Sequence, residues 1–295
     1  MKDNDLPITL SLGTATPGGG FPAYGAAFAA AVHAADPRVT ILPRNTAGSL
    51  ENARLLAAGG IDLGLVAGDA ATTALNDGSG ITLAAAMYAT PGMFALRGDH
   101  PARTIADLRG QRIAWGARGS GFIVLARQVM AGLGLDIERD FDAVLLDRAG
   151  DGPAMVLDGR AAALWGGGAG WPGFAAIAAG PMGLRFLAPN AVECEGILAA
   201  DPGLRPMSLP ARSYAGQAAP VASVGTWSLV LARPGLDDAA GFHLASALHA
   251  AQPGFAALLP QAAETTPENT AAAAPDPAQI HPGVRRFLRD AGLLP

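Results

Sequence analysis

Lysine, cysteine and charged residues are scarce in this chain of 295 residues. Lys2 is the only lysine. This excludes a phosphate-binding loop that ends in Gly-Lys-Ser/Thr, because that loop needs a lysine to neutralise the terminal phosphates. Cys194 is the only cysteine, which excludes an internal disulfide and a cysteine-based metal cluster. Charged residues make up 15% of the chain and the net charge is −5, so composition predicts no general attraction to nucleic acid or anionic membranes.

A second scarcity is that of long runs rich in large aliphatic residues. Residues 161–184 carry no charge and are long enough to cross a bilayer. They also contain many glycines and two prolines, which would break a spanning helix. We interpret the segment as strand, loop and helix, and we expect a protein that does not itself span a membrane.

Half of the residues are apolar, which is enough for one large domain or for two lobes with separate cores. Strand-like and helix-like segments alternate along the chain. This alternation predicts an α/β fold of parallel sheets covered by helices. The predicted strands cover residues 8–13, 39–45, 61–68, 111–116 and 224–235, with a largely extended segment at 81–98; the clearest predicted helices cover 23–35, 122–134 and 281–294.

Three glycine-rich loops each follow a strand and precede a helix, at residues 13–25, 117–121 and 166–170. In α/β folds, ligands bind at loops beyond the carboxyl ends of strands. A helix N-terminus there presents unpaired N–H groups to an anion, and Arg118 would add a guanidinium for a carboxylate. Any one of these loops is equally well explained as a tight turn. Three of them, together with an arginine and nearby aromatic residues, favour ligand binding.

The sequence gives less support to the hypothesis that the protein is an enzyme. Gly18, Gly20 and Ala23 fit a variant of the dinucleotide-binding motif, but Arg44 stands near the end of the second strand, where that motif needs an acid. Ser120 lacks the outer glycines of a nucleophile elbow, since Arg118 and Phe122 occupy those positions. The histidines show no metal-ligand spacing. We therefore expect no catalytic residue, no metal and no cofactor; a cytoplasmic dinucleotide-binding enzyme is kept as the weaker alternative.

Four segments carry a resemblance to a known family: residues 13–32, 45–66, 104–135 and 280–294. The patterns "GSLENARLLAAGGIDLGLV" and "HPGVRRFLRDAGL" are the most specific of them. With these segments in this order over almost the whole chain, the sequence resembles the TAXI-type solute receptors of TRAP transporters, the tripartite ATP-independent periplasmic uptake systems.

The resemblance implies a two-lobed, type II periplasmic binding protein (a venus flytrap) that binds a small organic anion in a cleft and delivers it to TRAP integral-membrane subunits. Lobe one would be residues 1–97 and 226–295, and lobe two residues 98–225, with crossings at 93–97 and 226–232. It also implies a monomer with a periplasmic location, its leader removed from this sequence. An ABC-type binding protein for sulfonates or similar anions has the same fold and is the main alternative.

Departures from the family pattern suggest the ligand's character. Phe21–Pro22 stand where the family usually has two tyrosines, Phe122–Ile123 where it has a small hydroxyl residue and an acid, and Arg118 where it has a proline. We therefore predict a carboxylate with a less polar body than glutamate. The predicted ligand-binding residues are Thr14, Gly19, Gly20, Phe21, Ser49, Asn52, Arg118, Gly119, Ser120, Gly121, Phe122, Trp165, Gly168 and Trp171.

Overall fold

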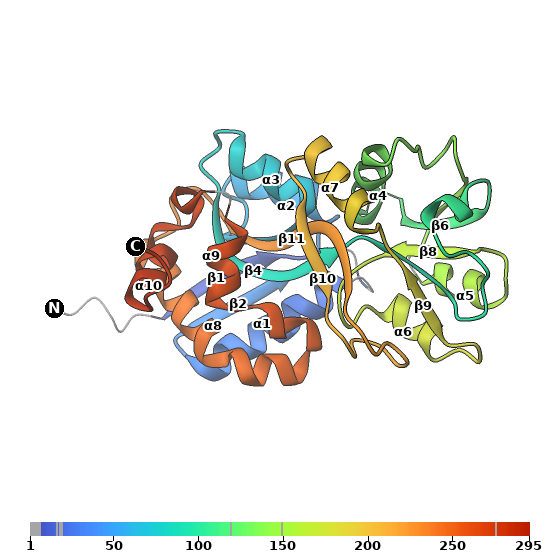
Figure 1. Ribbon diagram of the computed structural model, residues 1–295. Coiled ribbons are helices and arrows are strands. Elements are labelled where there is room, and N and C mark those ends of the chain that lie inside the picture. Colours follow the sequence, from blue (N-terminus) through green and yellow to red (C-terminus); the bar gives the residue numbers. More distant parts are fainter. Residues whose placement is uncertain (1–6, 16, 18–19, 119, 149, 275) are drawn as a thin grey trace. The chain divides into compact units, whose positions relative to one another are not determined.

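The chain forms two compact units in a computed structural model, which describes residues 7–15, 17, 20–118, 120–148, 150–274 and 276–295. The first unit consists of Met1–Tyr88 and Trp227–Pro295, and the second of Ala89–Thr226. The chain passes from one unit to the other within two strands, β4 (Thr82–Pro91) and β11 (Val221–Ala232) (Figure 1).

The first passage differs from the one expected at residues 93–97. That segment is β5 (Met93–Arg97), and it pairs on both sides inside the second unit, with β8 (Ala163–Gly166) and β9 (Leu184–Leu187). Gly92 separates β4 from β5 and donates its N–H to the Val224 carbonyl. Both strands are apolar and adjacent in sequence, so composition alone gives no sign that the chain changes units before β5.

The sheet of the first unit has the order β2-β1-β3-β11, and β4 also pairs with β11. β1 (Ile8–Gly13) runs parallel to β2 (Val39–Arg44) and to β3 (Leu63–Ala67), whereas β11 is antiparallel to β3. The parallel strands therefore end at the same edge, where the loops after Gly13, Arg44 and Ala67 gather.

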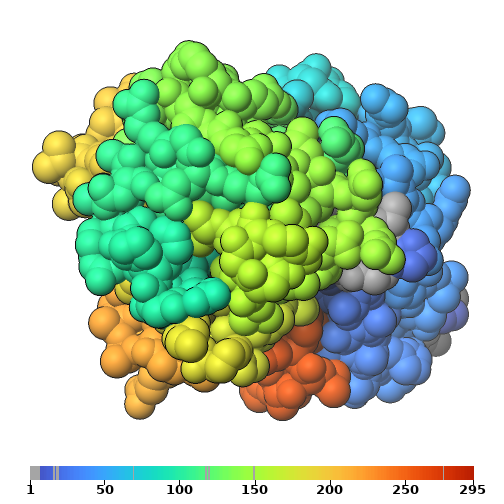
Figure 2. Space-filling model, turned by 90° about the vertical axis from the view of Figure 1, so that its right-hand side faces the viewer, coloured from blue at the N-terminus to red at the C-terminus, as the bar shows by residue number. Residues whose placement is uncertain are grey.

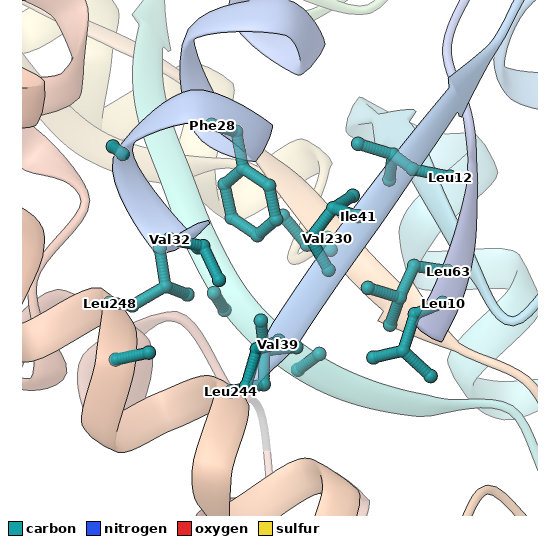
Figure 3. Close-up of a cluster of buried hydrophobic side chains, with 14 of the residues drawn as sticks. Leu10, Leu12, Phe28, Val32, Val39, Ile41, Leu63, Val230, Leu244 and Leu248 are labelled. Carbon is teal, nitrogen blue, oxygen red and sulfur yellow. The ribbon is translucent and has the colours of Figure 1, made fainter. Parts of the chain in front are cut away.

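Helices of the first unit bury apolar side chains against this sheet. Figure 3 shows Phe28 and Val32 of α1 and Leu244 and Leu248 of α8 meeting Leu10, Val39 and Ile41 of the strands. Burying each such side chain contributes about 1.5–3 kcal/mol relative to its exposure. The helices are α1 (Gly20–Ala35), α2 (Ser49–Ala57), α3 (Gly68–Asn76), α8 (Asp238–Leu258), α9 (Pro267–Ala273) and α10 (Pro282–Asp290).

The sheet of the second unit has the order β7-β6-β8-β5-β9. β6 (Arg112–Ala117) runs parallel to β7 (Asp142–Leu146) and to β8, and β5 is antiparallel to β8. β10 (Arg205–Leu209) pairs with the first half of β11. The helices are α4 (Gly121–Gly132), α5 (Asp151–Leu157), α6 (Pro172–Ala178) and α7 (Ala191–Ala200).

The predicted alternation of strands and helices is confirmed, and each unit has an α/β fold whose sheet is flanked by helices. The sheets are mixed and not parallel throughout as predicted, because β11 runs antiparallel to β3 and β5 runs antiparallel to β8. The uncharged segment 161–184 divides into β8, a loop and α6, as predicted, because Pro172 begins the helix. No helix in the described ranges is both long and apolar enough to cross a membrane.

Candidate functional site

Polar side chains from the loops after β1 and β2 and from α2 meet at the carboxyl ends of β1, β2 and β3 in the first unit. Thr14 is 1% exposed, and its hydroxyl donates to the Arg44 carbonyl at 3.0 Å. The Thr46 hydroxyl lies 2.8 Å from Asn52 Oδ1 and 3.2 Å from the Thr14 carbonyl. These bonds tie the loop after β1 to the loop after β2.

Asn52 is the centre of this network. Its side chain is fully buried, and its Nδ2 donates to the carbonyls of Thr14 at 2.7 Å, Leu65 at 2.8 Å and Gly13 at 3.2 Å. A buried amide whose donors and acceptor all have partners is a support for the surrounding backbone. The side chains of Thr14 and Asn52, two of the predicted ligand-binding residues, both face inward.

Ser49 is the first residue of α2, and Gly48 (φ 109°) is the N-cap residue of this helix. The Ser49 hydroxyl accepts the N–H of Ala67 at 3.1 Å, so it fixes the end of β3. Gly20 is exposed at the start of α1, with open space where a side chain would stand. Phe21 is half-buried against the core of the first unit. Gly19 lies outside the described residues.

In the second unit, three segments gather at one edge of the sheet. β6 ends at Ala117, the parallel β8 ends at Gly166, and Met93 at the start of β5 pairs with Gly166. The predicted loops at 117–121 and 166–170 therefore lie at the same edge. We call this edge, with residues 118, 120–122 and 166–171, the strand-end site.

Arg118 lies at the strand-end site with its side chain 67% exposed. Its Nε is 3.5 Å from Asp147 Oδ1, and the Asp147 side chain is 89% exposed. An ion pair that exposed contributes little. The guanidinium is therefore open to a stronger anionic partner. Gly119, the next predicted residue, is outside the described part of the chain.

Ser120 is the N-cap of α4 and has extended backbone angles (φ −74°, ψ 150°). Its Oγ is buried and has no hydrogen-bond partner among the residues that the structure describes. A Cβ at Gly116 (φ 118°) would lie 3.3 Å from this Oγ, which is a tight contact. Any larger residue at position 116 would therefore crowd the Ser120 hydroxyl. The exposed Gly121 follows in the first turn of α4. A buried hydroxyl without a partner is unusual and calls for an explanation.

Two aromatic rings, those of Phe122 and Trp171, also belong to the strand-end site. Phe122 and Trp171 are both half-buried, and their ring centroids are 5.0 Å apart. Trp165 differs from them: it is fully buried against Phe94, and its Nε1 donates to the Phe122 carbonyl at 2.9 Å. The ring of Trp165, one of the predicted ligand-binding residues, is thus part of the core and supports Phe122 from behind.

Tyr214 holds the loop after β8 in place, and our sequence reasoning missed it. Its hydroxyl donates to the Gly168 carbonyl and accepts the Trp171 N–H, each at 2.7 Å. Burial raises the pKa of Tyr214, so the hydroxyl remains a donor at neutral pH. Gly168 is buried with φ 89°, a conformation that favours glycine. No local pattern marks Tyr214, since it lies 43 residues beyond Trp171.

The strand-end site offers binding groups: a guanidinium, a helix N-terminus, a hydroxyl and two aromatic rings. Within the described ranges, no cluster of three or more His, Cys, Asp or Glu residues could hold a metal ion.

Comparison with solved structures shows the same fold over nearly the full length. The periplasmic aliphatic sulphonate binding protein SsuA from Escherichia coli is 17% identical, with a TM-score of 0.52, over 98% of this chain and 89% of that one. A TctC solute binding protein from Polaromonas is 17% identical, with a TM-score of 0.56, over 97% and 99%. A protein from Bordetella bronchiseptica is 12% identical, with a TM-score of 0.56, over 97% and 98%. No curated protein matches this sequence.

The sequence itself matches one family across both units. The match runs from residue 12, in β1, to residue 292, just beyond α10, and so includes the strand ends and loops described above. The chain belongs to the NMT1-like family.

Proposed function

We propose that this protein is an extracytoplasmic solute receptor, which binds a small organic anion and delivers it to a membrane transporter. The observation that carries this proposal is the strand-end site, where one edge of a sheet holds a buried hydroxyl without a partner among the described residues, an exposed guanidinium, a helix N-terminus and two aromatic rings. The periplasmic location of SsuA, whose fold this chain shares, supports the extracytoplasmic part of the proposal.

The ligand is an acid with a largely apolar body. Arg118 pairs with the acidic group, since a guanidinium can donate two parallel hydrogen bonds to one carboxylate. The Ser120 hydroxyl and the first turn of α4 donate to the same group, in a position where the helix dipole favours a negative charge. Phe122 and Trp171 contact the body, because ligand pockets combine aromatic walls with a few polar anchors.

In the first unit, the start of α1 holds two further residues that are predicted to bind ligand. Gly20 is exposed there and leaves the backbone open to approach, and Phe21 adds apolar surface. Ser49 and the network around Asn52 hold the neighbouring strand ends. In this assignment Thr14, Asn52 and Trp165 act as supports for residues that touch the ligand.

A sulfonate is the second candidate for the acidic group. SsuA is named as an aliphatic sulphonate binding protein, and this chain shares its fold. A sulfonate and a carboxylate present the same kind of acceptor oxygens to a guanidinium, so the residues described above suit either. Sequence motifs favour delivery to TRAP integral-membrane subunits, whereas a sulfonate ligand would favour an ABC transporter. Capture of the membrane partner from a native membrane extract distinguishes the two transporters.

Calorimetric titration with a matched series tests the proposal: octanoate, octanesulfonate and glutamate, each at constant ionic strength. We expect saturable binding of octanoate or octanesulfonate and weaker binding of glutamate. The absence of saturable binding by all three acids would contradict the receptor assignment. Binding of glutamate alone would contradict the apolar body.

The role of Arg118 is tested with Arg118→Gln, which keeps a polar but shorter side chain and removes the charge. We expect the affinity to fall at least tenfold, or by about 1.4 kcal/mol. Arg127→Gln is the matched control, because Arg127 is an exposed arginine of α4 that pairs with Glu138 at 2.8 Å. Equal affinity of the two variants would contradict a role for Arg118 as the anchor.

A further inference from the structure

A pocket of about 430 Å³ lies in the second unit, away from the strand-end site. Its lining comes from the end of β5 and the turn after it, the start of β6, and the turn between α5 and β8. β6 begins at this pocket and ends at the strand-end site, so the two lie at opposite edges of one sheet. In Figure 2 the teal segment around residues 97–112 lies beside the yellow-green segment around residues 156–162 on one face.

Three arginines line this pocket, namely Arg97, Arg112 and Arg160. Each is held by a carboxylate: Arg97 by Asp99 at 2.6 Å, Arg112 by Asp142 at 2.8 Å and Arg160 by Asp158 at 2.7 Å. Of these carboxylates, Asp99 alone is in the lining. The lining itself therefore holds three arginines and one aspartate, and Asp142 and Asp158 balance two of these arginines from outside it.

The ion pairs orient the guanidinium groups and leave part of each group open. The Asp99 carboxylate accepts hydrogen bonds from Nε and Nη2 of Arg97. The Asp158 carboxylate accepts a hydrogen bond from Nε of Arg160 and forms an ion pair with its Nη2. Nη1 of Arg97 points to the turn after α5, 3.9 Å from the position that a Cβ would take at Gly159. A guanidinium that is already fixed loses less conformational entropy when it binds a further anion.

Neighbouring groups add to the attraction for anions. Arg185 lies behind the lining and donates from Nη2 to the His100 carbonyl at 2.7 Å. His100 Nδ1 accepts the Ala102 N–H at 3.3 Å, which requires the neutral ring. Burial and the charge of Arg185 both lower the pKa of His100. At neutral pH the positive charge of the pocket therefore comes from arginines alone.

Size and the apolar part of the lining limit the ligand. About 430 Å³ is within the range of small-molecule pockets. Pro101, Val156, Ala161 and Ala162 supply apolar surface between the arginines, which suits a short carbon skeleton. We propose that this pocket is a second binding site of the protein, specific for a small organic dianion such as a dicarboxylate or a phosphate monoester.

Calorimetry at constant ionic strength tests the site with succinate, glycerol 3-phosphate, inorganic phosphate and acetate as probes. We expect saturable binding of a dianion that is at least tenfold tighter than binding of acetate, because a second negative charge engages a second arginine. Tighter binding of succinate or glycerol 3-phosphate than of inorganic phosphate supports the organic ligand. Inorganic phosphate as the tightest ligand would overturn the role of the apolar lining, and no saturable dianion binding would overturn the site.

Variants locate the binding. The double variant Arg112→Gln/Arg160→Gln should weaken dianion binding at least tenfold and leave octanoate binding at the strand-end site unchanged. Arg127→Gln, with a similarly exposed and paired arginine, should leave both unchanged. Dianion affinity that survives the double variant but is lost in Arg118→Gln would overturn the proposal, because the dianion would then occupy the strand-end site. Melting curves of each variant verify that it is folded.

Discussion

At the scale of single residues, Asn52 shows how one side chain holds three strand ends. Replacement by alanine would leave the carbonyls of Thr14 and Leu65 and the Thr46 hydroxyl without their present partner. Buried groups left unsatisfied cost about 1–3 kcal/mol each, offset in part by water entering the space. We expect Asn52→Ala to lower the free energy of unfolding by about 2–4 kcal/mol, measured by urea denaturation.

Asn76→Ala is the matched control for this substitution. Asn76 is exposed at the end of α3, where its Nδ2 donates to the Thr72 carbonyl. Exposed substitutions of this kind change stability by about 0.5 kcal/mol or less. Equal effects of the two substitutions would contradict the assignment of Asn52 as the support of the strand ends.

Residue roles were harder to predict than residue positions. The sequence analysis named Asn52 as a predicted ligand-binding residue, but the direction of its side chain depends on Gly13 and Leu65, which come from two other segments. Trp165 and Trp171 are both tryptophans beside the same glycine run, yet one is fully buried and the other half-buried. Their difference depends on Phe94 and Tyr214, which are far away in sequence.

At the scale of elements, Asp62 links three strands of the first unit. Its Oδ2 accepts both the N–H and the hydroxyl of Ser11 in β1, at 2.9 and 2.8 Å, and its Oδ1 accepts from Arg233, just after β11, at 2.9 Å. Asp62 itself directly precedes β3. Burial raises the pKa of Asp62, but the hydrogen bonds from Ser11 and Arg233 outweigh it and leave the pKa below its usual value.

A lowered pKa makes the stability from Asp62 dependent on pH. The contribution is complete above the usual aspartate pKa and is lost as pH falls through the lower pKa of the folded state. We expect Asp62→Asn to lower the free energy of unfolding by about 1 kcal/mol at pH 7, since the site is partly exposed and screened. The difference from wild type should shrink below about pH 4, measured by urea denaturation from pH 3 to pH 7.

Asp290→Asn, at the exposed end of α10, is the control variant for the same urea denaturation between pH 3 and pH 7. A difference at Asp62 that stays constant down to pH 3 would contradict the link between its hydrogen bonds and its charge.

Elements were predicted best where a local signal marks their ends. β1 has the predicted bounds, and Thr104 caps the short helix at 105–108 with a capping box. α1 begins at Gly20, three residues before the predicted start, because its first residues lie in the glycine loop and lack a local start signal. The break between β4 and β5 at Gly92 was not predicted, because both strands are apolar and no local signal separates them. Pairing with β8 and β9 decides where β5 belongs.

At the scale of the whole molecule, ligand binding to one unit is expected to raise the melting temperature of that unit. A ligand that binds the folded state stabilises it by RT ln(1 + [L]/Kd), about 2.7 kcal/mol at a hundredfold excess over Kd. Arg118, Ser120 and Trp171 all belong to the second unit. We therefore expect octanoate, or octanesulfonate if it binds more tightly, to raise the melting temperature of the second unit by about 5 °C, measured by differential scanning calorimetry.

Arg118→Gln makes this expectation quantitative. A tenfold weaker Kd reduces the ratio of ligand to Kd from 100 to 10, which reduces the stabilisation to about 1.4 kcal/mol and the shift to about half. Sodium chloride at the same ionic strength separates specific binding from screening, because salt weakens exposed ion pairs without occupying the site. Equal shifts in wild type and Arg118→Gln would place the anion elsewhere on the molecule. A shift that sodium chloride reproduces would mean that the ligand acts only as an electrolyte.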